Sequence, residues 1–286
     1  MSAFDEPAVI TCALTGAGSR EGMPQIPATP KEFAEEARRV ADAGASVVHI
    51  HGRDPLTGAP SHDVGHFQAI VQAIRESAPE LIINITTGGG IHLSPEERMA
   101  PALAVHADFG TISMGSLNLA AVSADRSTFD YDLVFGNSFS TITHFLEEMN
   151  RASMQIDYEF YEAGHIANYN LLQEQKLTGP GVFSLILGVT GAMAATTHSL
   201  VHMVQLLPAH AHWEVVTPGL KQWPMAAASF GLGGTARVGF EDNAYLSAGV
   251  VARSNGDLVD KVVRMANDIG RTIATPSQAR EILGVR

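Results

Sequence analysis

The sequence has few of the residues on which several classes of protein depend. A single cysteine, Cys12, excludes an intramolecular disulfide and any metal site built from several cysteines, so a bound metal would need histidine and carboxylate ligands. Lys and Arg number 18 against 30 Asp and Glu, and the resulting net charge of −12 repels nucleic acid. No apolar run approaches the ~20 residues of a membrane-spanning helix, and the N-terminus opens acidic. We therefore expect a cytoplasmic protein that binds neither nucleic acid nor a membrane.

The chain does contain a regular alternation of two kinds of segment. Short β-branched runs alternate with longer amphipathic stretches, a pattern typical of βα units that feed a parallel sheet. We predict eight strands, at 9–14, 47–51, 81–86, 109–114, 155–160, 182–187, 213–217 and 235–240. We predict helices between them at 30–43, 64–77, 95–105, 141–152 and 197–207, among others. The third helix has a clear start, because Ser94 is a good N-cap and Pro95 and two acids follow it.

Eight such units in 286 residues, with no linker between them, predict a single (β/α)₈ TIM barrel that spans residues 1–286 as one domain. The alternative is an open, doubly wound sheet. That fold would need a glycine fingerprint for phosphate after a strand, which neither Gly16-x-Gly18 nor Gly231-x-Gly233-Gly234 supplies.

Histidines at the end of the second predicted strand are the first functional signal. Residues two apart on a strand share a face, and barrel active sites lie where the strands end. His49 and His51 therefore project together at the catalytic end, which favours a metal site over a hydrogen-bonded core histidine. The pair His210 and His212 has the same spacing but precedes its strand, and we expect it at the opposite, stabilising end of the barrel. His198 and His202 are expected on an outer helix, without the glutamate of a zincin motif.

The same alternation brings further polar residues to the catalytic end, namely Asn84, Thr86, Thr111, Ser113, Asp157, Glu159, Arg237 and Glu241. Polar groups at core positions are costly unless they are paired or functional. Asp157 and Glu159 fit either a structural salt bridge or support of the site, and Arg237 and Glu241 fit a mutual ion pair. Two neutral histidines leave a divalent cation short of a third protein ligand, however, so Glu241 is the predicted third ligand.

The segment Thr86-Thr87-Gly88-Gly89-Gly90 follows the third predicted strand. Its hydroxyls and unobstructed backbone N–H groups suit a small anion such as a carboxylate, and a flexible loop is the alternative.

At these residues the chain resembles the β-keto acid cleavage enzymes, over nearly its whole length. The likeness is carried by the segments 15–17, 48–53, 85–89, 115–118, 237–243 and 274–280. The combination of His-x-His on one strand with Gly-Phe-Glu-Asp-Asn at the last strand is the specific part of it.

The resemblance implies zinc, one ion per subunit, held by His49, His51 and Glu241, and an acid-base role for Asp242 supported by Arg237. It implies contacts from Thr86, Gly89 and Thr111 to the carboxylate of a small β-keto acid, with acetyl-CoA as co-substrate. It also suggests a homotetramer. The family pattern includes a glutamate that binds the amino group of an aminohexanoate substrate, and here that position is Gly18, two residues before Arg20. We therefore expect a substrate with a neutral or anionic tail.

Two other functions stay open at this point. One is a hydrolase of the amidohydrolase type, which also places His-x-His in a barrel, although on the first strand. The other is a non-catalytic barrel that binds an anion or a metal. An assay that depends on acetyl-CoA separates all three.

Overall fold

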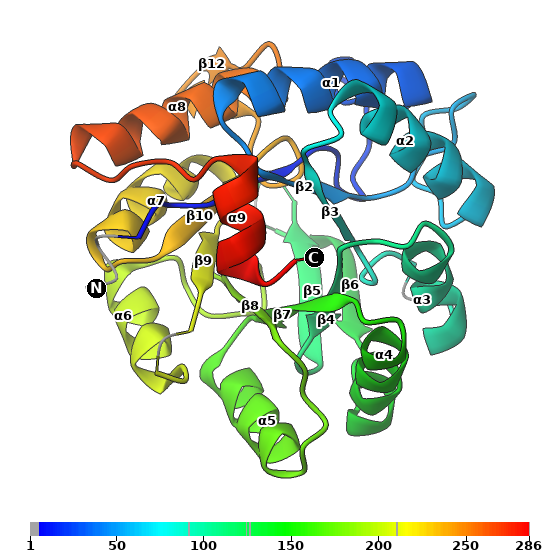
Figure 1. Ribbon diagram of the computed structural model, residues 1–286, viewed down its shortest axis with the longest axis vertical. Coiled ribbons are helices and arrows are strands. Elements are labelled where there is room, and N and C mark those ends of the chain that lie inside the picture. Colours follow the sequence, from blue (N-terminus) through cyan, green and yellow to red (C-terminus); the bar gives the residue numbers. More distant parts are fainter. Residues whose placement is uncertain (1–5, 91, 124, 126, 210, 286) are drawn as a thin grey trace.

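The computed structural model describes residues 6–90, 92–123, 125, 127–209 and 211–285, and a closed parallel barrel is its central feature (Figure 1). The barrel strands are β1 (Ile10–Ala13), β2 (Val47–Ile50), β3 (Ile82–Ile85), β4 (Phe109–Ser113), β7 (Gln155–Phe160), β8 (Gly181–Ile186), β9 (Trp213–Val216) and β10 (Thr235–Val238). Each pairs in parallel with its neighbours, and β1 pairs with both β2 and β10, which closes the ring. The predicted TIM barrel and its eight strands are confirmed, each strand end lying within two residues of its predicted position.

Helices surround the barrel (Figure 1). They are α1 (Pro30–Ala43), α2 (Val64–Ser77), α3 (Pro95–Ala104), α4 (Phe139–Arg151), α5 (Ala163–Glu174), α6 (Thr197–Leu206), α7 (Gln222–Gly231) after a short 3₁₀ turn η1 (Gly219–Lys221), α8 (Asn255–Asp268) and α9 (Pro276–Leu283). The predicted start of α3 is confirmed: Ser94 accepts a hydrogen bond from the Glu97 backbone, while the Glu97 side chain accepts one from Ser94.

Two apolar layers hold the fold together. The larger lies between the strands and the outer helices and includes Ile10, Val48 and Phe67. The smaller fills the N-terminal end of the barrel interior with Val9, Val47, Ile82, Phe109 and the C-terminal helix residues Ile282 and Leu283. In Figure 1 α9 lies across this end of the barrel. Apolar side chains from the strands and α9 thus line much of this end of the barrel.

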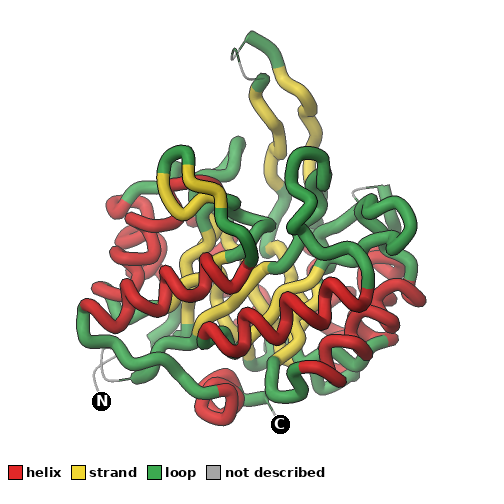
Figure 2. Tube along the Cα trace, turned by 90° about the horizontal axis from the view of Figure 1, so that it is seen from above, coloured by secondary structure: helices red, strands yellow, loops and turns green. Residues whose placement is uncertain are grey.

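Two small antiparallel hairpins were not predicted. One joins β5 (Leu117–Val122) to β6 (Phe129–Phe135), and the other joins β11 (Tyr245–Ser247) to β12 (Val250–Val251). Figure 2 shows the β5–β6 hairpin standing well clear of the barrel, at the end where β4 finishes. Both lie within stretches that the alternation of βα units assigns to loops.

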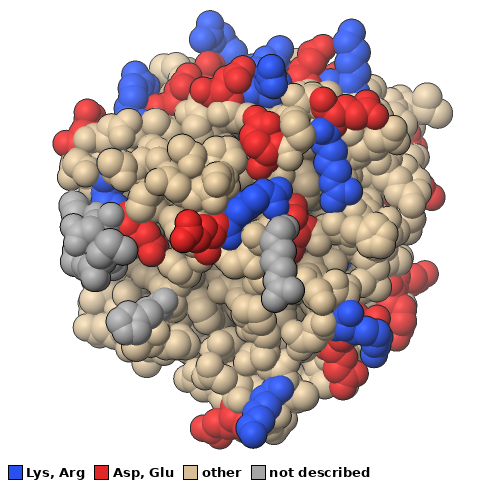
Figure 3. Space-filling view, in the orientation of Figure 1, with Lys and Arg blue, Asp and Glu red and all other residues tan. Residues whose placement is uncertain are grey.

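The surface shows no strong division of charge on the face seen in Figure 3, where Lys and Arg are interspersed with Asp and Glu. In the described part of the chain, no helix is both long enough and apolar enough to cross a membrane.

Candidate active site

The two histidines of the second strand lie together at the C-terminal end of the barrel. His49 is the third residue of β2 and His51 follows the strand, so the side chains share a face and their ring centroids are 5.3 Å apart. The end of β1 holds this segment in place, because the Thr15 hydroxyl donates to the His51 carbonyl at 3.1 Å. His49 is buried and His51 is partly exposed. The predicted placement of both imidazoles at this end is confirmed.

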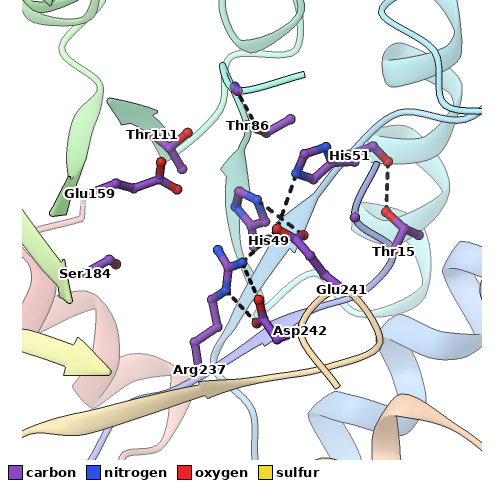
Figure 4. Close-up of polar contacts among 12 residues, drawn as sticks. Thr15, His49, His51, Thr86, Thr111, Glu159, Ser184, Arg237, Glu241 and Asp242 are labelled. Atoms are coloured by element: carbon purple, nitrogen blue, oxygen red, sulfur yellow. Dashed lines mark hydrogen bonds and ion pairs between the residues drawn. The ribbon is translucent and has the colours of Figure 1, made fainter. Parts of the chain in front are cut away.

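Glu241 reaches these histidines from the end of β10. Its Oε2 atom lies 3.6 Å from His49 Nε2, and its Oε1 atom lies 3.4 Å from His51 Nε2 (Figure 4). One nitrogen from each histidine and one oxygen from Glu241 all lie within 4.8 Å of one another, so this group can hold a metal ion. In the closed barrel β1 lies between β10 and β2, so the segment after β10 reaches the histidines of β2 across β1.

A sharp turn after β10 directs Glu241 into the site. Gly239 has φ +134°, and a Cβ atom on it would lie 2.1 Å from the Ala13 carbonyl oxygen of β1. The next backbone N–H, that of Phe240, donates to the Asn255 side chain at 2.8 Å. Only glycine fits this close approach of β10 to β1, and the approach brings the following residues over the barrel.

Arg237 joins Glu241 to Asp242. Its Nη2 atom donates to Glu241 Oε1 at 2.7 Å and to Asp242 Oδ1 at 3.0 Å, and its Nε atom donates to Asp242 Oδ2 at 3.0 Å. The Arg237 side chain is 4% exposed. The ion pair between Arg237 and Glu241 that the sequence suggested is therefore present, together with a two-pronged pair to Asp242.

Burial and these charges set the protonation of the site. Burial lowers the pKa of His49 to about 3 against the opposing attraction of Glu241, so this ring is neutral. Burial raises the pKa of Glu241, but the charge of Arg237 and the neighbouring histidines outweigh it and hold the pKa well below its usual range. The pKa of Asp242 is raised by burial, and Arg237 opposes that rise.

The donor set fits a divalent metal. Two imidazole nitrogens and one carboxylate are a common ligand set of catalytic zinc, which needs neutral histidines and an ionised carboxylate. Glu241 Oε2 is buried and has no hydrogen-bond partner among the described residues, as expected of an oxygen that faces a cation.

Hydrogen bonds to neighbouring residues hold the glycine-rich loop after β3 in place. The Thr87 backbone donates to Thr111 Oγ1 at 3.1 Å, and the Gly88 backbone donates to Thr86 Oγ1 at 2.9 Å. Each of these hydroxyls thus accepts an internal hydrogen bond and keeps its own proton to donate. Buried Arg98 donates to the Thr87 carbonyl at 2.7 Å and so restrains the loop.

Gly89 lies against His62, a residue that the sequence did not single out. A Cβ atom on Gly89 would lie 2.4 Å from His62 Cε1. His62 Nε2 is buried without a hydrogen-bond partner among the described residues, and burial, with His51 and Arg98 nearby, lowers the pKa of His62 to about 4. A single histidine in a polar loop gives no periodic signal, so no sequence pattern marks it.

Asp157 and Glu159 do not form a salt bridge with any described residue. Asp157 accepts from Asn84 at 2.7 Å and from Ser184 at 2.6 Å. Glu159 accepts from Ser113 at 2.8 Å and from Tyr161 at 3.3 Å, and burial beside Asp157 raises the pKa of Glu159 to about 7. The sequence allowed either a structural salt bridge or support of the site for these two residues, and among the described residues the salt bridge is absent.

Ser184 and Glu214 extend this interior polar layer and were also missed. Each is buried and stands between apolar neighbours on a strand, in Phe183-Ser184-Leu185 and Trp213-Glu214-Val215. That signal is readable from the sequence once the strands are placed.

The two other histidine pairs that the sequence analysis considered, and Arg20, lie elsewhere. His198 and His202 are exposed on α6, as predicted. His212 precedes β9 and pairs with Glu6 at 3.0 Å, at the N-terminal end of the barrel, whereas His210 lies outside the described residues. Arg20 donates to the Pro24 carbonyl at 2.7 Å and lies 3.4 Å from Glu32, which ties it to the start of α1.

Comparison with known proteins places the chain in a family. A family model described as beta-keto acid cleavage enzyme matches residues 7–285. The 3-keto-5-aminohexanoate cleavage enzyme of Acetoanaerobium sticklandii is 36% identical over 282 residues, covering 98% of this chain and 99% of that protein. The 3,5-dioxohexanoate:acetyl-CoA acetone transferase of Paraburkholderia graminis is 30% identical over 297 residues, covering 97% of this chain and 96% of that protein.

Among solved structures, the apo structure of ObcA covers 92% of this chain and 66% of that chain, with a TM-score of 0.76 and 21% identity, and so shares the fold. The resemblance found in the sequence is thus confirmed, and the chain is an enzyme of the beta-keto acid cleavage enzyme family.

Proposed function

We propose that this enzyme condenses a short β-keto acid with acetyl-CoA and releases acetoacetate and a new acyl-CoA. The observation that carries the proposal is the meeting of His49, His51 and Glu241 with the Arg237–Asp242 pair at the C-terminal end of the barrel. The names of the relatives support the substrate class, since they describe cleavage of a keto acid and transfer that involves acetyl-CoA.

The metal proposed for this site is one zinc ion per subunit. Held by His49, His51 and Glu241, it would polarise the ketone and carboxylate of the substrate and stabilise negative charge that develops beside them. Thr86, Gly89 and Thr111 would bind the substrate carboxylate, because the two hydroxyls each have a proton to donate and Gly89 belongs to the same loop as Thr86.

Asp242 is the proposed base. It follows the Glu241 ligand directly, and Arg237 holds both of its oxygens, so the carboxylate lies beside the bound substrate without serving as a ligand. Asp242 would remove a proton from the α-carbon, which then attacks the thioester carbonyl of acetyl-CoA and releases the CoA thiolate. The thiolate adds to the original ketone carbon, the bond between that carbon and the α-carbon breaks, and Asp242 returns the proton to the acetoacetate that leaves.

The tail of the substrate is proposed to be neutral or anionic. Gly18 offers no carboxylate where the family pattern has a glutamate, and a Cβ atom there would meet nothing within 4 Å. An anionic tail would not be bound by Arg20 in the arrangement seen, because Glu32 and the Pro24 carbonyl already engage it.

We further propose a homotetramer. The β5–β6 hairpin supports assembly, because Phe129 is 58% exposed and Tyr131 is 48% exposed on a two-stranded element that projects from the barrel. A two-stranded hairpin is marginally stable alone, so packing against a second subunit would stabilise it.

Metal analysis and an acetyl-CoA-dependent assay test the proposal together. We expect about one zinc per wild-type subunit, loss of zinc in the double variant His49→Ala/His51→Ala, and turnover of a β-keto acid only when acetyl-CoA is present. His198→Ala/His202→Ala, on the exposed face of α6, is the matched control and should keep both properties. Turnover without acetyl-CoA would indicate a hydrolase instead, and zinc retained in full by the first double variant would refute the ligand assignment.

A further inference from the structure

The side of His49 that faces away from Glu241 needs a hydrogen-bond partner. Its Nε2 atom faces Glu241, so Nδ1 points into the barrel interior, where it is buried. A histidine that binds a metal through one nitrogen carries a proton on the other, and an acceptor for that proton fixes the tautomer and the direction of the ring. Nδ1 makes no hydrogen bond of ordinary geometry to any described residue.

Asn84 offers the matching acceptor. It stands beside His49 in register on β3, it is 3% exposed, and its Oδ1 atom also lacks a partner of ordinary geometry among the described residues. Burial lowers the pKa of His49, and a hydrogen bond that Asn84 accepts from His49 opposes this lowering, so the two side chains lie close together. A lone donor and a lone acceptor thus face each other across two neighbouring strands.

Asp157 fixes which end of the Asn84 amide faces His49. The Nδ2 atom of Asn84 donates to Asp157 Oδ2 at 2.7 Å. A carboxylate only accepts hydrogen bonds, so the NH₂ group must face Asp157 and the carbonyl oxygen must face away from it. The orientation of this amide is therefore set by chemistry rather than chosen freely.

Ser184 and Glu214 in turn hold Asp157. The Ser184 hydroxyl lies 2.6 Å from Asp157 Oδ1 and 3.1 Å from Glu214 Oε1. A hydroxyl has one proton, so when Ser184 donates it to Asp157, the contact with Glu214 needs a proton from the glutamic acid. Burial, with Asp157 nearby, raises the pKa of Glu214 to about 7, which agrees with a protonated side chain.

We propose that Asn84, held by Asp157, is the positioning residue that accepts the Nδ1 proton of His49 and orients this ligand toward the metal. The chain Glu214–Ser184–Asp157–Asn84–His49 then links the barrel interior to the metal site. In this way the buried polar residues support the metal site, although they take no part in the proposed acyl-transfer steps. The inference rests on the proposed metal site.

The test is metal affinity measured without turnover. Zinc binding to the metal-free protein is measured by competition with a chromophoric chelator, and the absorption spectrum of the Co²⁺-loaded protein reports the ligand geometry. We expect Asn84→Ala to bind zinc about 10–100-fold more weakly than wild type and to change the Co²⁺ spectrum, as removal of such outer partners does. Asp157→Asn, which changes almost no volume, should weaken zinc binding in the same direction, because an amide no longer dictates the orientation of Asn84.

Val47→Ala is the matched control. Val47 lies two residues before His49 on the same strand and is 4% exposed, and it contacts the apolar layer rather than the polar chain. It should lower the melting temperature while zinc affinity stays within about twofold of wild type. Failure of wild type to bind zinc would refute the proposed metal site itself. If wild type binds zinc and both Asn84→Ala and Asp157→Asn bind it equally well, the positioning role is wrong and the metal site stands.

Discussion

Arg237 serves two acidic residues with one guanidinium group. Its Nη2 atom contacts both Glu241 and Asp242, and its Nε atom completes the pair to Asp242. Arginine suits this role because its donors form a rigid fork that stays charged when buried. Burial raises the pKa of Asp242 while Arg237 opposes the rise, which agrees with the proposed role of Asp242 as a base.

Asp242→Asn should separate metal binding from chemistry. An asparagine keeps the shape of the side chain and can still accept from Arg237, but it cannot remove a proton. We expect zinc content equal to wild type and a loss of turnover of at least ~10²-fold. Steady-state kinetics with a β-keto acid and acetyl-CoA, beside elemental analysis, check this. Activity within a few-fold of wild type would transfer the role of base to another carboxyl, with Glu159 the next candidate.

The open space at Gly18 predicts a change of substrate preference. A Cβ atom at this position would meet nothing within 4 Å, so Gly18→Glu should fold normally and add a carboxylate to the first loop. Pairing an amine that is otherwise buried without a partner is worth roughly 1–3 kcal/mol, so kcat/KM for 3-keto-5-aminohexanoate should rise about tenfold or more.

Gly18→Gln is the control for side-chain size, and the deamino substrate is the control for the charge. An equal gain with both variants, or with both substrates, would contradict a charge-specific effect of the glutamate. A wild-type enzyme that already prefers the amino substrate would contradict the proposed neutral or anionic tail.

At the scale of elements, the turn after β10 assembles the site. Gly239 approaches the backbone of β1, and Asn255 at the start of α8 accepts from the Phe240 backbone and also contacts Glu36 of α1. The position of Glu241 thus depends on contacts of the turn after β10 with β1 and α8, and of α8 with α1.

Gly239→Ala should damage both folding and the site. The added methyl group would lie 2.1 Å from the Ala13 carbonyl oxygen, at φ +134°, so β10 and β1 must move apart. We expect a loss of about 3 kcal/mol or more in the free energy of unfolding, together with weaker zinc binding because Glu241 is displaced. Denaturant unfolding and zinc titration measure the two effects.

Gly249→Ala separates steric contact from backbone conformation. Gly249 has φ +77° in the exposed β11–β12 turn, and a Cβ atom there meets nothing within 4 Å. This control should cost only about 1 kcal/mol and leave zinc binding unchanged. Equal costs for the two variants would show that the approach of β10 to β1 is not the limiting contact.

At the scale of the whole molecule, the barrel interior is apolar at one end and acidic in the middle. Val9, Val47 and Phe109 fill the N-terminal end, whereas Asp157, Glu159 and Glu214 lie further along the strands. Burial is the largest cause of the raised pKa of each of these three carboxyl groups. Each of these groups therefore binds a proton more readily in the folded protein than in the unfolded chain, and stability should depend on pH.

The raised pKa of Glu214 determines whether stability rises or falls as the pH increases. Burial raises its pKa from 4.5 to about 7, so the folded protein binds a proton that the unfolded chain has lost between these values. Its contribution is fully present below pH 4.5 and is lost as the pH rises through about 7, at a cost of about 3 kcal/mol. The stability of Glu214→Gln relative to wild type should rise by about 2.5 kcal/mol from pH 5 to pH 8, as measured by denaturant unfolding. A difference between the two proteins that does not change with pH would show that Glu214 is not the group that titrates.

The projecting hairpin predicts assembly through its apolar side chains. Phe129→Ser/Tyr131→Ser replaces two exposed rings of β6 and should convert a tetramer into smaller species without unfolding the barrel, since neither ring is buried. Light scattering after size-exclusion chromatography measures the mass. Leu56→Ser, at a residue that is 94% exposed elsewhere, is the control and should leave the mass unchanged. A wild-type monomer would refute the proposed tetramer.

Patterns within single segments of the chain were enough to predict much of the fold. Side chains alternate along a strand and turn residues bound it, so eight strands, the barrel and the shared direction of His49 and His51 could be predicted without long-range information. The motif at 239–243 was visible too, and with it the family. These features depend on spacing within single segments.

Contacts between segments that are distant in the sequence could not be predicted in this way. The convergence of Glu241 with His49 and His51 needs barrel closure and the Gly239 turn, and the polar chain from Glu214 to His49 crosses strands that are far apart in sequence. Arg20 pairs with Glu32 because its loop folds back on α1, and β5 and β6 leave the barrel to pair with each other. Such contacts are selected by packing and hydrogen bonding in three dimensions, which periodicity along one chain does not encode.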